Sequence, residues 1–127
     1  MKNEPSASVM RVLVCGSRHF YDINKMSSVL TEFNETNEIS TIIHGDARGA
    51  DTLAGGFAQR HGIPVSVFPA QWAEFGKRAG PIRNTQMLVE GKPDHVIAFR
   101  APNSRGTQNM INQATKAGIP VTVIEIE

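Results

Sequence analysis

A chain of 127 residues is long enough for one domain with a single buried core. Hydrophobic residues make up 40% of it, the net charge is +1 and there is one cysteine. These values exclude an internal disulfide and give no indication of wholesale binding to nucleic acid or to an anionic membrane. No apolar run is long enough to span a bilayer, and residues 1–9 predict a short polar tail, so we expect a cytoplasmic protein.

Five runs rich in valine and isoleucine predict strands, and four stretches with helical spacing alternate with them. In chain order the nine expected elements are strand 10–15, helix 22–33, strand 40–44, helix 50–61, strand 63–68, helix 81–90, strand 95–99, helix 107–117 and strand 119–126. Such alternation implies a parallel sheet with helices on both faces. The predicted fold is therefore an α/β, Rossmann-like three-layer sandwich of about five strands, forming a single domain over residues 10–127.

Ligands of open parallel sheets bind beyond the carboxyl ends of the strands. The four loops expected there are residues 16–21, 45–51, 69–83 and 99–106. They hold seven of the 13 Lys and Arg residues but only three acids, so they carry a charge of +4 while the whole chain carries +1. This separation of charge favours an anion site at the edge over loops that are merely polar.

The first two of these loops have features of phosphate sites. In "GSRHF", Gly16 permits a tight turn, and Ser17 and Arg18 follow it, although a plain strand-to-helix turn has the same residues. In "HGDARGAD", Gly45 and Gly49 allow unusual backbone angles, Arg48 suits bidentate phosphate binding, and a helix start offers free amides. Its two acids are Asp46 and Asp51. Asp51 either caps the helix or binds a ligand.

The other two loops add further candidates. The connection 72–84 is far longer than the ordinary ~2 to 6 residues and is expected to be functional. Trp72 and Phe75 either anchor it, the commoner role, or stack on a base. Its candidate ligand residues are Lys77, Gly80, Arg83 and Asn84, and those at the start of the last helix are Gly106 and Thr107. Arg83 is unfavourable near a helix start, so an anion is expected beside it.

Several other sites are not supported. No His, Cys or Glu spacing resembles a metal site, and no P-loop or G-x-G-x-x-G motif is present, so no metal and no cofactor are expected. Cys15 ends the first expected strand, and a buried structural cysteine is far more probable there than a nucleophile.

The motifs "RVLVCGSRHF", "IIHGDARGAD", "FGKRAGPIRN" and "RGTQNM" together resemble the small SLOG-superfamily proteins related to YspA and YpsA. More distantly the chain is similar to the Lonely Guy phosphoribohydrolases and to the DNA-processing protein DprA. The resemblance implies a Rossmann-like fold, a nucleotide or nucleotide-derived ligand, and a homodimer or higher homo-oligomer.

The chain departs from this family at three positions. Asp46 replaces the second glycine of the usual "HGGARGAD", "PNSRGT" replaces "PGGxGT", and Met110 replaces the glutamate that serves glycosidic cleavage in Lonely Guy enzymes. An acid common in the small family is here Asn109. These changes affect cleavage more than ligand binding.

The leading hypothesis is therefore a nucleotide-binding sensor, sequestering protein or accessory module. The first alternative is a nucleotide N-glycosidase, for which Asp46 and Asp51 are the candidate catalytic carboxylates. The second is single-stranded nucleic-acid binding, against which the low charge and the 6% aromatic content argue.

Overall fold

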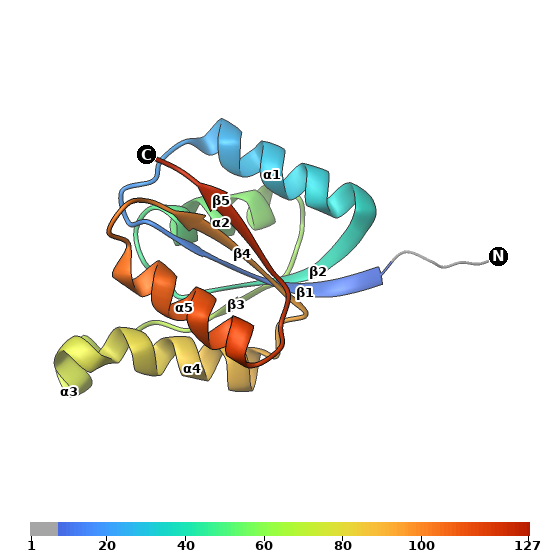
Figure 1. The fold of residues 1–127 in the computed structure, drawn as a ribbon. Helices are drawn as coiled ribbons and strands as arrows, with labels where there is room; N and C mark the ends of the chain where they lie inside the picture. The colour runs from blue at the N-terminus through green and yellow to red at the C-terminus, as the bar shows by residue number, and fades with distance from the viewer. Residues whose placement is uncertain (1–7) are drawn as a thin grey trace.

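The computed structural model describes residues 8–127, which form a five-stranded parallel sheet covered on both faces by helices (Figure 1). The strands are β1 (Ser8–Gly16), β2 (Asn37–His44), β3 (Val65–Val67), β4 (His95–Arg100) and β5 (Val121–Glu125). The helices are α1 (Ile23–Thr36), α2 (Ala50–Arg60), α3 (Trp72–Phe75), the 3₁₀ turn η1 (Gly76–Arg78), α4 (Ala79–Gly91) and α5 (Arg105–Lys116). The predicted α/β Rossmann-like architecture is confirmed.

The sheet order is β3-β2-β1-β4-β5, with every neighbouring pair parallel. From β1 the chain first adds β2 and then β3 on one side, and it later adds β4 and then β5 on the other side of β1. The connecting helices change from one face of the sheet to the other at this reversal. Helices α1 and α2 cover one face, and α4 and α5 cover the other (Figure 1). A change of winding direction leaves a crevice beyond the carboxyl ends of the two central strands, where ligands of such folds bind.

Two apolar cores lie on the two faces of the sheet because successive strand residues point to opposite sides. In β1, Val12 and Val14 pack under α1 and α2, whereas Leu13 and Cys15 pack under α4 and α5. The central strands are buried on both sides, which is why they read as continuous apolar runs rather than alternating ones.

Several boundaries differ from those expected. β1 begins at Ser8, while the remainder of the expected tail, residues 1–7, lies outside the described residues. α1 continues to Thr36 and passes directly into β2, which begins at Asn37, because the Asn34 side chain accepts a hydrogen bond from the N–H of Ile39 at 2.8 Å and closes the junction. The polar residues at this junction gave no apolar signal.

The long connection after β3 is not a loop. It contains α3 and η1, and α4 begins at Ala79 rather than at Pro81. Pro81 is tolerated there because it lies in the first turn, where no intrahelical N–H donor is needed. Within residues 8–127 no helix has the length and apolarity to cross a membrane.

Candidate functional site

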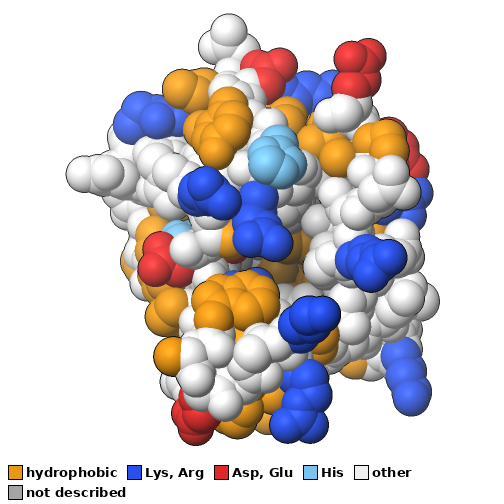
Figure 2. All heavy atoms as spheres, turned by 90° about the vertical axis from the view of Figure 1, so that its left-hand side faces the viewer, with side chains coloured by type: hydrophobic (Ala, Val, Ile, Leu, Met, Phe, Trp, Pro, Cys, Tyr) orange, Lys and Arg blue, Asp and Glu red, His pale blue; other side chains and the backbone are white. Residues whose placement is uncertain are grey.

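The candidate site lies at the carboxyl edge of the sheet, where the loops after β1, β2 and β4 meet the amino ends of α2, α4 and α5. Figure 2 views this edge from outside and shows Lys and Arg side chains spread across it, with the visible Asp and Glu side chains nearer its outline. Lys and Arg side chains are therefore exposed on this face of the molecule.

Close packing of glycines holds the first two loops together. A Cβ added to Gly16 would lie 2.6 Å from the carbonyl oxygen of Phe99 and 2.8 Å from Cβ of Ala50, so β1, β4 and α2 approach one another only because this residue has no side chain. Gly49 has a φ of +76°, and a Cβ there would collide with the backbone of Ser17 and Arg18. The Ser17 carbonyl in turn accepts the N–H of Ala50 at 3.1 Å. Gly16 and Gly49 thus place the "GSR" turn against the start of α2.

Asp51 is turned toward its own loop. Its Oδ2 accepts hydrogen bonds from the N–H groups of Gly45 at 3.0 Å and of Ala47 at 3.1 Å, and the residue is 6% exposed. Burial raises the pKa of this carboxyl, while the Ala47 amide, His44, Arg83 and the Gly45 amide act in the opposite direction. Asp51 therefore stabilises the β2–α2 loop and does not serve as the side-chain cap of α2.

His44 and Asp46 complete this loop. The N–H of Asp46 donates to Nδ1 of His44 at 3.0 Å, which requires a free lone pair on that nitrogen and places the ring proton on Nε2. Burial lowers the pKa of His44, in agreement with a neutral ring. Asp46 adopts a φ of +61° and its side chain is exposed. Asp46 is consequently the acid of this loop whose carboxylate faces outward.

Arg83 and Asn84 brace the site from α4. Nη1 of Arg83 donates to the Gly45 carbonyl at 2.6 Å, and its Nε donates to Oδ1 of Asn84 at 3.1 Å. Nδ2 of Asn84 donates to the Gly106 carbonyl at 3.3 Å and to Oδ1 of Asn109 at 3.1 Å. A continuous chain of hydrogen bonds therefore connects the β2–α2 loop with the start of α5.

The environment of Arg83 combines opposite charges. Burial lowers the pKa of this guanidinium, Asp51 and Cys15 oppose the change, and Arg18 adds to it. The acid expected near Arg83 is thus Asp51, which belongs to another loop. Arg18 is thus near enough to disfavour the charge of Arg83, and an anion bound beside Arg83 would favour that charge.

The amino end of α5 is open. Ser104, its N-cap residue, makes no side-chain cap, and the N–H groups of Arg105, Gly106 and Thr107 have no hydrogen-bond partner within the described chain. Thr107 is 5% exposed, and no hydrogen bond of its hydroxyl is found among residues 8–127. Free amides at a helix start bind anions well.

The remaining predicted residues are arranged less closely. Arg48 is exposed in the β2–α2 loop, Lys77 is exposed in η1, and Gly80 lies in the first turn of α4 against the Trp72 ring. Arg100, counted among the cations of this edge, pairs instead with Glu125 at the end of β5 and donates to Gln108. Glu125 lies outside the four loops, so their sequence gave no sign of this partner.

Two further expectations concern reactive groups. Cys15 is buried, and burial raises the pKa of its thiol well above the ordinary range, so the group stays protonated and unreactive. Among the described residues, no three His, Cys, Asp or Glu side chains cluster in a way that could hold a metal ion.

Fold and site together define a Rossmann-like α/β domain with a cationic carboxyl edge and an open helix start. Residues 10–75 match the family model of the YspA, cpYpsA-related SLOG family. The chain is also 37% identical over 117 residues to the Gene 61 protein of Mycobacterium phage D29, covering 87% of this chain and 93% of that protein. The chain belongs to the YspA, cpYpsA-related SLOG family, as its motifs predicted.

The fold is similar to that of DNA processing protein A (DprA) from Streptococcus pneumoniae, with a TM-score of 0.72 over 92% of this chain and 19% sequence identity. The chain spans half the length of that DprA chain. This likeness shows the shared fold.

Proposed function

We propose that this chain binds a nucleotide or nucleotide-derived ligand at the carboxyl edge and acts as a sensor, a sequestering protein or an accessory module. The observation that supports this most is that two separate loops, those after β1 and β2, present the exposed cations Arg18 and Arg48 at this edge. Among residues 8–127 the amides of Arg105, Gly106 and Thr107, at the same edge, have no hydrogen-bond partner. Both features favour an anionic group such as phosphate.

We assign different roles to the two carboxylates of the β2–α2 loop. Asp51 already accepts two loop amides and is buried, so its role is to hold the loop that presents Arg48. Asp46 is exposed beside these cations and is the acceptor we assign to a sugar hydroxyl or to the edge of a base. A carboxylate accepts hydrogen bonds from both kinds of donor. An acid at this edge is therefore compatible with phosphate binding nearby.

Isothermal titration calorimetry of the full chain with nucleoside 5′-monophosphates and cyclic dinucleotides tests this proposal. The Arg18→Ala and Arg48→Ala variants each remove an exposed cation and should weaken binding about tenfold, because charge-assisted bonds contribute roughly 1.5–3 kcal/mol. Arg60→Ala, at the far end of α2, is the matched control and should bind as the wild type does. Unchanged affinity in both edge variants would refute the anion site.

Cleavage of the base–ribose bond is the rival activity. With Asp51 engaged in its loop, Asp46 is the candidate catalytic carboxylate. Incubation with each nucleoside monophosphate and chromatography of the products distinguishes the two: free base released by the wild type but not by Asp46→Asn would establish an enzyme. Binding without release would establish a module.

Two other properties follow from the family. We propose self-association as a homodimer or higher homo-oligomer, which light scattering during size exclusion measures directly. The fold likeness to a DNA processing protein prompts a direct test with single-stranded oligonucleotides. We expect weak binding to them, because the net charge is only +1 and aromatic residues are few.

A further inference from the structure

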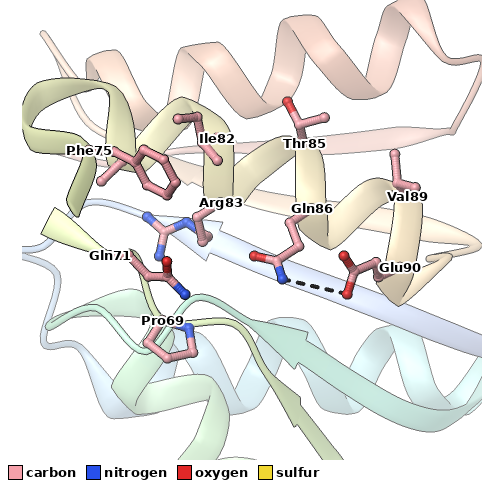
Figure 3. A pocket seen from close by; sticks show the side chains of 10 residues that line it. Pro69, Gln71, Phe75, Ile82, Arg83, Thr85, Gln86, Val89 and Glu90 are labelled. Carbon is pink, nitrogen blue, oxygen red and sulfur yellow. Dashed lines mark hydrogen bonds between the residues drawn. The ribbon is translucent and has the colours of Figure 1, made fainter.

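A groove of about 520 Å³ runs along the outer side of α4, between this helix and the segment that follows β3 (Figure 3). Phe75 and Ile82 contribute apolar surface, and Gln71 and Gln86 contribute side-chain amides. Ligand pockets of such volume are typically apolar with a few polar groups that fix orientation. The groove therefore has the size and mixed lining of a small-molecule site.

Arg83 connects this groove to the carboxyl edge. Its guanidinium lines the groove, and in Figure 3 it lies close to Gln71 and Phe75. The same guanidinium donates through Nη1 to the Gly45 carbonyl in the β2–α2 loop. Within the part of the chain that is described, only its Nε and Nη1 make hydrogen bonds, so Nη2 is available. One cation thus belongs to both surfaces.

The two ends of the groove carry opposite charge. Arg83 lies at the end near the cationic edge, and Glu90 lies seven residues further along α4, about 10 Å away at 1.5 Å per residue. Gln86 lies between them, with Nε2 3.5 Å from the Glu90 carboxylate. A phosphate is attracted to the Arg83 end and repelled from the Glu90 end. A group that enters the Glu90 end therefore carries no negative charge and offers hydrogen-bond donors.

We propose that this groove holds the heterocyclic base of the nucleotide whose phosphate binds at the carboxyl edge. The inference rests on the proposed function and adds the position of the base to it. The flat face of the base stacks on Phe75, and its polar edge exchanges hydrogen bonds with the Gln71 amide, which both donates and accepts. Its donor groups are directed along the helix toward Gln86 and Glu90.

Paired titrations separate the base from the phosphate. Ribose 5-phosphate and the four nucleoside 5′-monophosphates are each titrated into the full chain by calorimetry. Phe75→Leu keeps apolar bulk but removes the aromatic face, and we expect it to weaken nucleotide binding about tenfold, since base–aromatic stacking contributes strongly to affinity. Phe75→Tyr keeps the ring and should retain wild-type affinity. Gln71→Ala should also weaken nucleotide binding, whereas Gln59→Ala on exposed α2 surface should not.

The ribose 5-phosphate titrations distinguish loss of base binding from loss of phosphate binding. The groove variants should bind this probe as the wild type does, because it has no base. Nucleotide affinity unchanged in Phe75→Leu and Gln71→Ala would overturn the base site while leaving the edge site standing. An equal loss of affinity for the nucleotide and for ribose 5-phosphate would also overturn the base site, because the variants would then act on the carboxyl edge itself. A wild type that binds neither probe would refute the proposed function as well.

A second copy of the chain is the competing occupant, since Ile82 is 38% exposed and Val89 is 66% exposed beside the groove. Light scattering of Val89→Glu tests this. A dimer that dissociates in Val89→Glu, with nucleotide affinity unchanged, would show that the groove is a subunit interface and would overturn the proposal. An unchanged oligomeric state together with the selective loss in Phe75→Leu would support it.

Discussion

Removal of the Asp51 carboxylate is expected to destabilise the protein far more than removal of an ordinary capping aspartate. Asp51→Ala leaves the N–H groups of Gly45 and Ala47 without their acceptor in a buried loop. Hydrogen bonds to a charged group contribute roughly 1.5–3 kcal/mol each, which is about 3–6 kcal/mol for the two. Allowing for partial compensation by water, we expect a loss of about 3–5 kcal/mol in the free energy of unfolding.

Asp22→Ala is the matched control. Asp22 is exposed and caps α1 with one hydrogen bond, from the N–H of Lys25 at 3.0 Å, so its removal should cost about 1 kcal/mol. Asp51→Asn keeps a neutral acceptor oxygen and should fall between the two alanine variants. The three variants therefore separate loss of the acceptor from loss of the charge.

Urea denaturation followed by circular dichroism at pH 7 measures these differences, and thermal melts give a second reading. For a chain of 127 residues each kcal/mol corresponds to roughly 4 °C, so Asp51→Ala should lower the Tm by about 12–20 °C. If Asp51→Ala is no less stable than Asp22→Ala, the carboxylate does not hold the loop. Asp51 would then again be a candidate for a ligand or catalytic role.

Three further predictions concern the same loops. Gly49→Ala should lower the free energy of unfolding by about 3 kcal/mol or more, because backbone strain and a steric collision combine. Gly62→Ala is the control: it has a φ of +66° but no described atom within 4 Å of the added Cβ, so it should cost only about 1 kcal/mol. Equal losses of stability in urea denaturation would refute the collision at Gly49. Burial lowers the pKa of His44 below its ordinary value of 6.5, so below pH 6.5 the unfolded chain binds a proton on this ring more readily than the folded chain does. The contribution of His44 to stability is therefore full above pH 6.5 and falls as the pH decreases below it. His44→Asn keeps an acceptor for the Asp46 amide and should remove that part of the pH dependence; wild-type and variant curves that stay parallel below pH 6.5 would contradict this assignment. Asn84→Ala should cost about 2–3 kcal/mol because it removes three hydrogen bonds, two of which join α4 to α5. Exposed Asn112→Ala is the control and should cost less than about 0.5 kcal/mol, so a cost for Asn84→Ala near that of the control would show that these bonds are dispensable.

Local patterns in the sequence were sufficient for the architecture. The central segments 12–15 and 96–99 are apolar throughout because both of their faces are buried. Helix stops at Gly62 and Gly118 mark where the chain re-enters the sheet. Elements with weaker local signals were placed less well. β2 starts among polar residues at Asn37, and β3 shrinks to Val65–Val67 because it is an exposed edge strand with one neighbour.

The location of the site was also accessible from sequence, since parallel topology brings the carboxyl ends of all strands to one edge. The different roles of the residues within the site were not accessible from sequence. The sequence leaves both Asp46 and Asp51 as candidate ligand or catalytic residues, yet one carboxylate faces outward and the other accepts two amides of its own loop. Arg100 counts as a free cation until β5 brings Glu125 beside it.

By itself, then, the sequence determined the layer order, the family and the edge of the sheet where charge gathers, because these depend on short-range periodicity and on motifs. The tertiary structure decided which polar groups are already engaged and which remain open. Arg83 meets Gly45 across 38 positions of the chain, and Asn84 meets Gly106 across 22. Packing of α4 against the β2–α2 loop and α5 creates these pairings, and its packing beside the segment after β3 creates the groove. Such contacts join residues that are distant in sequence, so short-range patterns do not reveal them.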